Sequence, residues 1–380
     1  MNIEVNLNKL ISIVDKASRA TGKNLSLPIL SCILLKADSS SNNLNIKSTN
    51  LDIGVDFNLS IKCKNSGSVA VPANIFLNFL SSIKSDVNIN IVEKDGNLHL
   101  NAKNNKSVIK CFNVEDFPEI PKVDTSKKCN IKSTEFLSGL KNVWYSASTS
   151  SIKPELSSVY IYSGNQELIF VATDSFRLAE KTILFQKLNT EKSITLLVPG
   201  GSVLELLRLL DLPKESIVSL GDEKEVSIVS NKNQIIFQNS RIRFISRLTE
   251  GSFPDYEQII PKNFKAEALI KQKDLINQIK LASVFVGRLQ DIILILQPKN
   301  KKLLFQVSNP DIGEHESELE ISVNGEENSA KFNWKYLFDG INHVSTEYVV
   351  LGFNGDQSPL MIKGKGDTSY YYLAMPMRGM

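Results

Sequence analysis

The segment Ala172–Leu178 holds the side chains that come nearest to forming a reactive site. Thr173 supplies a hydroxyl, Asp174 a carboxylate and Arg177 a guanidinium, close together in the chain. This grouping predicts either a site in the cleft of an enzyme or a turn at a strand end with a local Asp–Arg pair. The pattern favours the turn, and the enzyme with a cleft site at Thr173, Asp174 and Arg177 is the alternative hypothesis.

Other catalytic and metal-binding patterns do not emerge from the sequence. The histidines His99, His315 and His343 form neither an H-E-x-x-H nor an H-x-E pattern, which argues against zinc hydrolysis. The cysteines are scattered without a C-x-x-C pair, which favours free thiols over a metal or dithiol site; they are Cys32, Cys63, Cys111 and Cys129. We therefore expect no metal, no cofactor and no catalytic residue.

Composition and charge are those of an ordinary globular protein. The 380 residues are 42% hydrophobic and 22% charged, and the net charge is only +3. This net charge is too small to attract a polyanionic partner by itself, so any attraction must come from the local arrangement of the basic residues. The start MNIEVNLNKL lacks the pattern of a signal peptide, and no apolar run reaches the ~20 residues that span a bilayer. We expect a cytoplasmic protein without membrane contact.

The elements that must position any site follow a pattern that occurs three times. A helix-period stripe with i, i+3, i+4, i+7 spacing opens each copy. The stripes are Leu10, Ile13, Val14 and Ala17, then Leu140, Val143, Trp144 and Ala147, then Leu275, Ile279 and Ala282 with a polar slip at Gln278. A repeat period this long indicates three copies of a whole domain rather than a solenoid.

Three further landmarks recur in the same order. An alternating strand ends in a hydroxyl and an Asn or Asp, at Thr49-Asn50, Thr173-Asp174 and Ser308-Asn309. A second apolar helix stripe follows, with Phe76, Leu77 and Leu80, then Val203, Leu204 and Leu207, then Leu337, Phe338 and Ile341. An apolar-proline step closes each copy, at Phe117-Pro118, Phe253-Pro254 and Met375-Pro376. Short strands with two helices per copy predict an α+β fold, with domains at 1–122, 128–258 and 262–380.

The whole chain resembles the bacterial DNA polymerase III beta subunit family, the sliding clamps. The resemblance rests on the segments Leu27–Leu30, Ala172–Leu178, Phe253–Tyr256 and Met375–Arg378, together with the threefold repeat. It implies three repeated DNA-clamp domains per chain and a ring-shaped head-to-tail homodimer, with helices lining the hole and sheets outside. It also implies a non-enzymatic processivity factor that encircles duplex DNA without regard to sequence and tethers the replicative polymerase. A separate ATP-driven clamp loader would place it on DNA.

The resemblance further implies a pocket in which partners dock a short clamp-motif peptide. The matching positions here are Leu156, Thr173, Ser175, Phe176, Arg177, Leu178, Pro254, Ile259, Leu373, Met375, Pro376, Met377 and Arg378. Methionine and proline would give an adaptable apolar floor, and Arg177 and Arg378 would bound the pocket and meet backbone or acidic groups. The family often has Gly-His where this chain has Ser175-Phe176, so the peptide preference stays open.

Positions that reach DNA in the family are also carried over by the resemblance. They fall on Lys23, Asn24, Asn74, Ser150, Lys153, Pro154 and Glu155, of which several are neutral and one is acidic. Basic residues expected on helix faces toward phosphate are Lys9, Lys16, Arg19, Lys141, Arg208, Lys271, Lys280 and Lys335. Weak phosphate contacts blind to sequence are what sliding requires.

Overall fold

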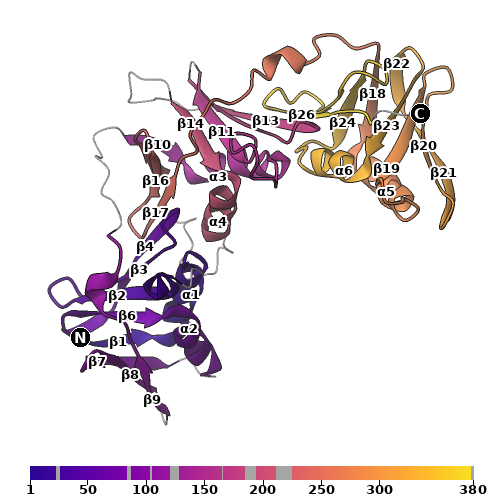
Figure 1. The fold of residues 1–380 in the computed structure, drawn as a ribbon. Coiled ribbons are helices and arrows are strands. Elements are labelled where there is room, and N and C mark those ends of the chain that lie inside the picture. The colour runs from indigo at the N-terminus through magenta and orange to yellow at the C-terminus, as the bar shows by residue number, and fades with distance from the viewer. Residues whose placement is uncertain are drawn as a thin grey trace. The chain divides into compact units, whose positions relative to one another are not determined.

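The computed structural model describes residues 1–22, 26–83, 87–102, 105–119, 128–164, 166–184, 194–210 and 225–377. These residues form two compact units (Figure 1). The first unit contains the described parts of 1–137 and 201–249, and the second contains those of 138–186, 193–200 and 250–380. The boundary between them falls within helix α3 (Ser133–Lys141) and again after the first residue of α4 (Gly200–Leu210).

Two antiparallel sheets form the first unit. The five-stranded sheet has the order β5 (Lys62–Asn65), β1 (Asn2–Asn6), β7 (Asn88–Lys94), β8 (Asn97–Ala102) and β9 (Asn105–Lys110). The eight-stranded sheet has the order β10 (Lys128–Lys132), β15 (Glu225–Ser230), β16 (Gln234–Gln238), β17 (Ile242–Arg247), β4 (Ile53–Ser60), β3 (Asn43–Thr49), β2 (Cys32–Asp38) and β6 (Gly67–Pro72). The pairing of β17 with β4 makes this second sheet continuous.

The helices of the first unit bury the stripes that the sequence predicts. They are α1 (Leu7–Arg19), α2 (Ala73–Ser82) and α4 (Gly200–Leu210), with short 3-10 turns η1 (Pro28–Ser31) and η2 (Val114–Asp116). Helix α1 begins where the Asn6 side chain accepts a 3.1 Å hydrogen bond from the Lys9 amide. Its stripe at Leu10, Ile13, Val14 and Ala17 is fully buried, which confirms the first predicted helix.

Two antiparallel sheets also form the second unit. The nine-stranded sheet has the order β14 (Thr195–Pro199), β11 (Ser158–Ser163), β12 (Glu167–Thr173), β13 (Arg177–Leu184), β26 (Tyr370–Ala374), β25 (Leu360–Gly364), β24 (Tyr348–Phe353), β18 (Ala266–Lys271) and β22 (Ser322–Gly325). The four-stranded sheet has the order β21 (Gly313–Glu320), β20 (Lys302–Asn309), β19 (Asp291–Gln297) and β23 (Asn328–Asn333). Its helices are α5 (Gln272–Ser283), α6 (Trp334–Asn342), η3 (Trp144–Ser146) and η5 (Glu257–Ile259).

Strand order confirms the threefold repeat. The series β4-β3-β2-β6, β13-β12-β11-β14 and β21-β20-β19-β23 share one order, and so do β1-β7-β8-β9, β10-β15-β16-β17 and β18-β24-β25-β26. The first strand of each copy leads into α1, α3 or α5, and β6, β14 and β23 lead into α2, α4 and α6. Each copy is therefore the same α+β module, as the landmarks predict.

The second helix stripe is a partial error of the sequence analysis. Helix α3 ends at Lys141, so Val143, Trp144 and Ala147 lie beyond it, with Trp144 in η3. The Asn142 side chain donates a 2.8 Å hydrogen bond to the Ser138 carbonyl, which satisfies an open acceptor of the last helical turn. The apolar residues after this stop are still buried or half-buried, which explains why the sequence keeps the helix spacing.

Candidate functional site

In the turn between β12 and β13, the Thr173 hydroxyl and the Asp174 carboxylate form hydrogen bonds to the backbone of the turn. The Thr173 hydroxyl donates to the Arg177 carbonyl at 2.6 Å and accepts from the Ser175 amide at 3.1 Å. Asp174 Oδ1 accepts from the amides of Phe176 and Arg177, both at 2.9 Å. This confirms the predicted strand-end turn. The enzyme alternative has no support, because the hydroxyl and the carboxylate hold the backbone.

The first copy closes its turn in the same way. The Thr49 hydroxyl donates to the Ile53 carbonyl at 2.7 Å, as Thr173 does to Arg177. The residue two positions after each threonine has a positive φ, +79° at Leu51 and +76° at Ser175. Non-glycine residues adopt this conformation only where neighbouring contacts hold it. The turn thus fixes the backbone before Phe176, a residue that is 62% exposed.

Arg177 lies at the centre of a polar network on the face of the sheet toward α6 and η3. Its guanidinium donates to Asp174 at 3.0 Å, to Asp339 at 2.6 Å and to the Tyr145 carbonyl at 2.7 Å. It also lies over the Tyr336 ring, 4.5 Å from the centroid. The sequence analysis predicted a local pair of Arg177 with Asp174, and the resemblance implied that Arg177 meets backbone or acidic groups at the edge of the pocket. Its acidic partners in the structure belong to the chain itself.

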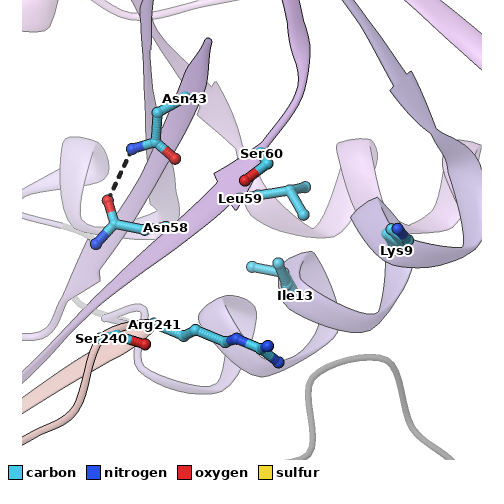
Figure 2. A pocket seen from close by; sticks show the side chains of 8 residues that line it. All are labelled: Lys9, Ile13, Asn43, Asn58, Leu59, Ser60, Ser240 and Arg241. Atoms are coloured by element: carbon cyan, nitrogen blue, oxygen red, sulfur yellow. Dashed lines mark hydrogen bonds between the residues drawn. The ribbon is translucent and has the colours of Figure 1, made fainter. Parts of the chain in front are cut away.

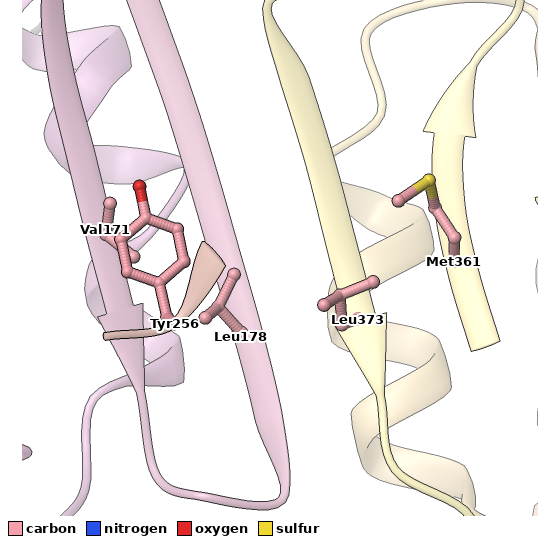
Figure 3. Close-up of a cluster of buried hydrophobic side chains, with 5 residues drawn as sticks. All are labelled: Val171, Leu178, Tyr256, Met361 and Leu373. Carbon is pink, nitrogen blue, oxygen red and sulfur yellow. The ribbon is translucent and has the colours of Figure 1, made fainter. Parts of the chain in front are cut away.

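The opposite face of the same strands carries an apolar cluster. Val171, Leu178, Tyr256, Met361 and Leu373 are buried against one another (Figure 3). Leu178 faces Leu373 directly in the β13–β26 pairing, so the two predicted pocket residues share one face. Because side chains alternate along a strand, Leu178 and its neighbour Arg177 point to opposite faces.

Residues 253–260, called the strap from here on, lie against this cluster. The strap includes two predicted pocket residues, Pro254 and Ile259, and both are exposed. Its residue Tyr256 is only 6% exposed and packs in the cluster, which contributes about 2–3 kcal/mol from apolar burial. Phe253 stacks on Tyr160 with 4.9 Å between ring centroids. The strap thus borders the cluster with a mixture of buried anchors and exposed pocket residues.

A half-buried carboxylate lies beneath the strap. Glu180 Oε2 accepts a 2.5 Å hydrogen bond from the Tyr256 hydroxyl and a 2.6 Å hydrogen bond from Tyr371. Tyr162 lies 2.9 Å from the Tyr256 hydroxyl. Burial raises the pKa of Glu180 above its ordinary value, although both phenol hydrogen bonds act in the opposite direction. The sequence analysis missed this group, since its only signal was an acidic residue in an otherwise ordinary strand.

The C-terminal segment runs beside the turn. The Met375 amide donates to the Phe176 carbonyl at 2.8 Å, which brings two predicted pocket residues together. The Met377 amide donates to the Lys331 carbonyl at 2.7 Å, so Pro376 lies between two fixed points. Arg378 lies outside the described residues.

Leu156 and four predicted DNA-binding residues share one loop. The loop 148–157 is closed by a 2.8 Å hydrogen bond from the Ser148 amide to the Leu156 carbonyl. Leu156 is buried at its base, while Ser150, Lys153 and Pro154 are exposed and Glu155 is half-buried. Asn74 is exposed in α2 of the other unit, and Lys23 and Asn24 lie outside the described residues.

Lys16 does not lie on an exposed helix face, contrary to the expectation that it faces phosphate. Its side chain is 5% exposed, and no hydrogen-bond partner for its Nζ is found in the part of the chain that the structure describes. Burial lowers the pKa of Lys16 to about 8, and of its neighbours Asp15 raises it while Arg19 lowers it further. This ammonium cannot face phosphate, because it lies inside the first unit. The helical period places Lys16 next to the apolar stripe of α1, but its burial depends on how α1 packs in the folded unit.

Other predicted basic residues keep partners of their own. Arg19 pairs with Asp15 at 2.9 Å, and Arg208 pairs with Glu205 at 2.6 Å. On the second unit, Lys280 lies over the Phe338 ring and Lys335 over the Trp334 ring. Lys271 lies 4.0 Å from Glu347, and Lys141 is half-buried at the end of α3. All of these pairs are at least partly exposed, so each contributes less than about 1 kcal/mol.

A hollow of about 470 Å³ in the first unit brings two cations to one place. It lies beside α1 and is lined by Lys9, Ile13, Asn43, Asn58, Leu59, Ser60, Ser240 and Arg241 (Figure 2). Neither Lys9 nor Arg241 forms an ion pair with any residue that the structure describes. The sequence analysis named Lys9 but missed Arg241, which the hairpin between β16 and β17 brings to the hollow.

Two further findings concern metals and membranes. Over the described residues, no group of three or more His, Cys, Asp or Glu side chains is placed to hold a metal ion. Cys32, Cys63 and Cys111 are free thiols, and the Cys129 side chain lies outside the described part. Within that same part, no helix combines the length and the apolar character needed to cross a bilayer.

Comparison with family models covers nearly the whole chain. Residues 1–121 match the N-terminal domain of the DNA polymerase III beta subunit, residues 130–255 its central domain, and residues 257–378 its C-terminal domain.

Curated relatives and solved structures agree with this match. The chain is 28% identical to a beta sliding clamp of Synechocystis, with 97% of both chains covered, and 23% identical to that of Synechococcus elongatus, with 100% and 99% covered. A sliding clamp of Pseudomonas aeruginosa bound to griselimycin superposes with a TM-score of 0.92, at 23% identity and full coverage of both chains. The corresponding values for the Bacillus subtilis clamp are 0.91 and 21%, again with full coverage.

Proposed function

Because the chain belongs to the DNA polymerase III beta-subunit family, we propose that it is a non-catalytic sliding clamp that encircles duplex DNA. It tethers the replicative polymerase and other partners, and a separate clamp loader places it on DNA. The observation that carries this proposal is the match of three successive family domains along one chain. Tethering raises processivity because each rebinding of the polymerase becomes an intramolecular event.

Two unpaired edge strands support a head-to-tail homodimer. Strands β9, β17 and β26 end equivalent series, and β4, β13 and β21 begin the other series. Within the chain, β17 pairs with β4 and β26 pairs with β13, both antiparallel. In both pairs, the last strand of one series pairs with the first strand of another. We therefore expect β9 to pair with β21 of a second copy. Each is a free edge in the described sheets, and a free edge presents unpaired backbone groups.

Internal equivalence also predicts the register of that pairing. Arg243 of β17 faces Asp56 of β4, and Tyr371 of β26 faces Glu180 of β13. In the strand series, Lys106 of β9 is equivalent to Arg243 and Tyr371. Glu316 of β21 is equivalent to Asp56 and Glu180. The same pairing therefore places Lys106 of one copy opposite Glu316 of the other. The charges agree with this register, since β9 carries Lys106 and Lys110 while β21 exposes four glutamates, Glu314, Glu316, Glu318 and Glu320. A heterologous interface of this kind closes a ring when its rotation fits.

The partner-peptide pocket is proposed on the face of the β13–β26 seam that carries Leu178 and Leu373. Leu178, Leu373 and Tyr256 form its buried floor, and Phe176, Pro254 and Met375 supply exposed or half-exposed apolar surface beside it. Large exposed apolar groups next to a packed floor suit a docking site for short peptides. Griselimycin, which is bound to the Pseudomonas clamp, is a suitable probe of this pocket.

DNA contacts are proposed to be few and blind to sequence. Candidate groups are Lys9 and Arg241 in the hollow, Asn74 in α2, and Ser150 and Lys153 in the loop 148–157. The net charge of +3 is consistent with weak contacts that do not stop sliding. Domains at 1–122, 128–258 and 262–380 and a cytoplasmic location belong to the same proposal.

Ring topology gives the sharpest test of the function. The protein is loaded by purified clamp loader onto nicked circular DNA, and its retention is measured by gel filtration before and after the circle is cut. We expect retention on the circle and rapid loss from the linear form. Equal retention on both forms would contradict encirclement. Loading of an unrelated DNA-binding protein onto the same circle is the control for ordinary affinity.

A further inference from the structure

We propose that Glu180 and Tyr256 are positioning residues of the partner-peptide pocket, holding the strap in the shape that receives a ligand. This inference rests on the pocket proposed above. It assigns a task to a half-buried carboxylate that lies under the strap on the same sheet face as Leu178. Neither residue needs to touch the ligand.

The strap depends on one side chain for its polar attachment to the sheet. Its backbone belongs to none of the described strand ladders, and its short turn η5 is closed only by local bonds such as Ile259 N–H to the Tyr256 carbonyl at 3.1 Å. Among the described residues, the hydroxyl of Tyr256 supplies the hydrogen bonds that tie the strap to the sheet. It donates to Glu180 at 2.5 Å and lies 2.9 Å from the Tyr162 hydroxyl.

Tyr256 is connected to the pocket both along the chain and through the packing of its ring. Tyr256 lies two residues after Pro254 and three before Ile259, which are the exposed pocket residues of the strap. Its ring lies beside Val171 and Leu178 in the buried cluster that also contains Leu373 (Figure 3). One group therefore fixes both the height of the strap above the floor and the direction of its exposed side chains.

Glu180 is suited to this task by its place in the seam. It faces Tyr371 in the β13–β26 pairing, and Tyr371 donates to the same oxygen as Tyr256, at 2.6 Å. Two phenols on one carboxylate oxygen fix that oxygen in position, and bonds to a charged acceptor are stronger than neutral ones. Without the tether, the ligand would have to order the strap on binding, which lowers the apparent affinity.

The chain offers a matched pair of variants for the test. Tyr256→Phe removes the tethering hydroxyl and keeps the buried ring. Tyr160→Phe makes the same change in a neighbouring ring of the cluster that stacks on Phe253 but shows no hydrogen bond from its hydroxyl to any described residue. Glu180→Gln keeps the shape of the acceptor and removes its charge. Met375→Ala alters a direct pocket residue.

Griselimycin binding to the full-length protein is measured by calorimetry, and amide hydrogen exchange of the strap is measured without ligand. We expect Tyr256→Phe and Glu180→Gln each to weaken binding about tenfold, the loss of one charge-assisted hydrogen bond. Their double variant should be no weaker than the worse single one, since both remove the same tether. The amides of Ile259 and Ile260 should exchange faster in Tyr256→Phe and in Glu180→Gln than in the wild type. Tyr160→Phe should change neither the binding affinity nor the exchange rates.

The outcomes separate the tether from the pocket. Equal binding and equal exchange for Tyr256→Phe and Tyr160→Phe would overturn the tether. If Met375→Ala weakens binding while Tyr256→Phe does not, the pocket stands and the positioning role falls. If neither variant weakens binding, the pocket assignment itself fails. Strap exchange needs no ligand, so it decides the tether even if the wild-type protein does not bind griselimycin.

Discussion

The guanidinium of Arg177 lies 2.6 Å from the carboxylate of Asp339 and joins the start of β13 to helix α6. The two residues are 162 positions apart in the chain. Arg177 is 12% exposed and its second partner Asp174 is 14% exposed, while Asp339 is 37% exposed, so the arginine charge is largely shielded from water. It also fixes the turn that carries Phe176, through the second bond of Arg177 to Asp174.

Arg177→Met is therefore expected to lower the free energy of unfolding by about 3 kcal/mol, because it leaves two carboxylates without their cation. Urea denaturation followed by circular dichroism measures this change. Arg208→Met is the matched control, since its pair with Glu205 has the same 2.6 Å distance but an arginine that is 48% exposed. The control should cost less than about 1 kcal/mol. Similar losses for the two variants would contradict a structural role for Arg177.

Lys16 predicts a pH dependence whose sign follows from its lowered pKa. Burial lowers that pKa from 10.5 to about 8, so between these values the unfolded chain binds more protons than the folded one. Stability therefore rises with pH across this window, and below pH 8 the buried charge costs about 3 kcal/mol. Lys16→Met should stabilise the protein at pH 7 and lose this advantage near pH 10.5.

Unfolding in urea at several pH values checks the Lys16 prediction. Lys9→Met, an exposed lysine on the same helix, should change stability little at any pH. A stabilisation by Lys16→Met that stays constant from pH 7 to pH 10.5 would show that the ammonium is not buried in solution.

The predicted register of the dimer can be tested by exchanging charges. Lys106→Glu should place two carboxylates opposite each other and raise the dimer dissociation constant about tenfold, as should Glu316→Lys through two cations. The double variant should restore much of the affinity, because the pair is only reversed. Sedimentation equilibrium at low salt measures the association. Lys94→Glu, at the end of β7, is the control and should have little effect.

The register fails if Lys106→Glu behaves like the Lys94 control. If both single variants weaken the dimer but the double variant does not recover, the two strands meet in a different register. The head-to-tail interface would then stand while the pairing of Lys106 with Glu316 would be wrong.

The sequence by itself determined the repeated module. Helical stripes such as Leu10 to Ala17 and strand-end pairs such as Thr173-Asp174 act within a few residues, so local period and turn chemistry were enough to predict them. The same local information failed at α3, where Asn142 ends the helix while the apolar spacing continues. Family segments at the turn, the strap and the C-terminus also placed the candidate pocket.

Only the tertiary structure decided which side chains meet. Leu178 and Arg177 are neighbours in the chain, yet strand alternation sends one to the apolar cluster and the other to Asp339. Glu180 gained its partners Tyr256 and Tyr371 from segments 76 and 191 residues away. Burial of Lys16 likewise depends on packing around α1. Such contacts depend on which strands pair and which faces are covered, and no local pattern records those choices.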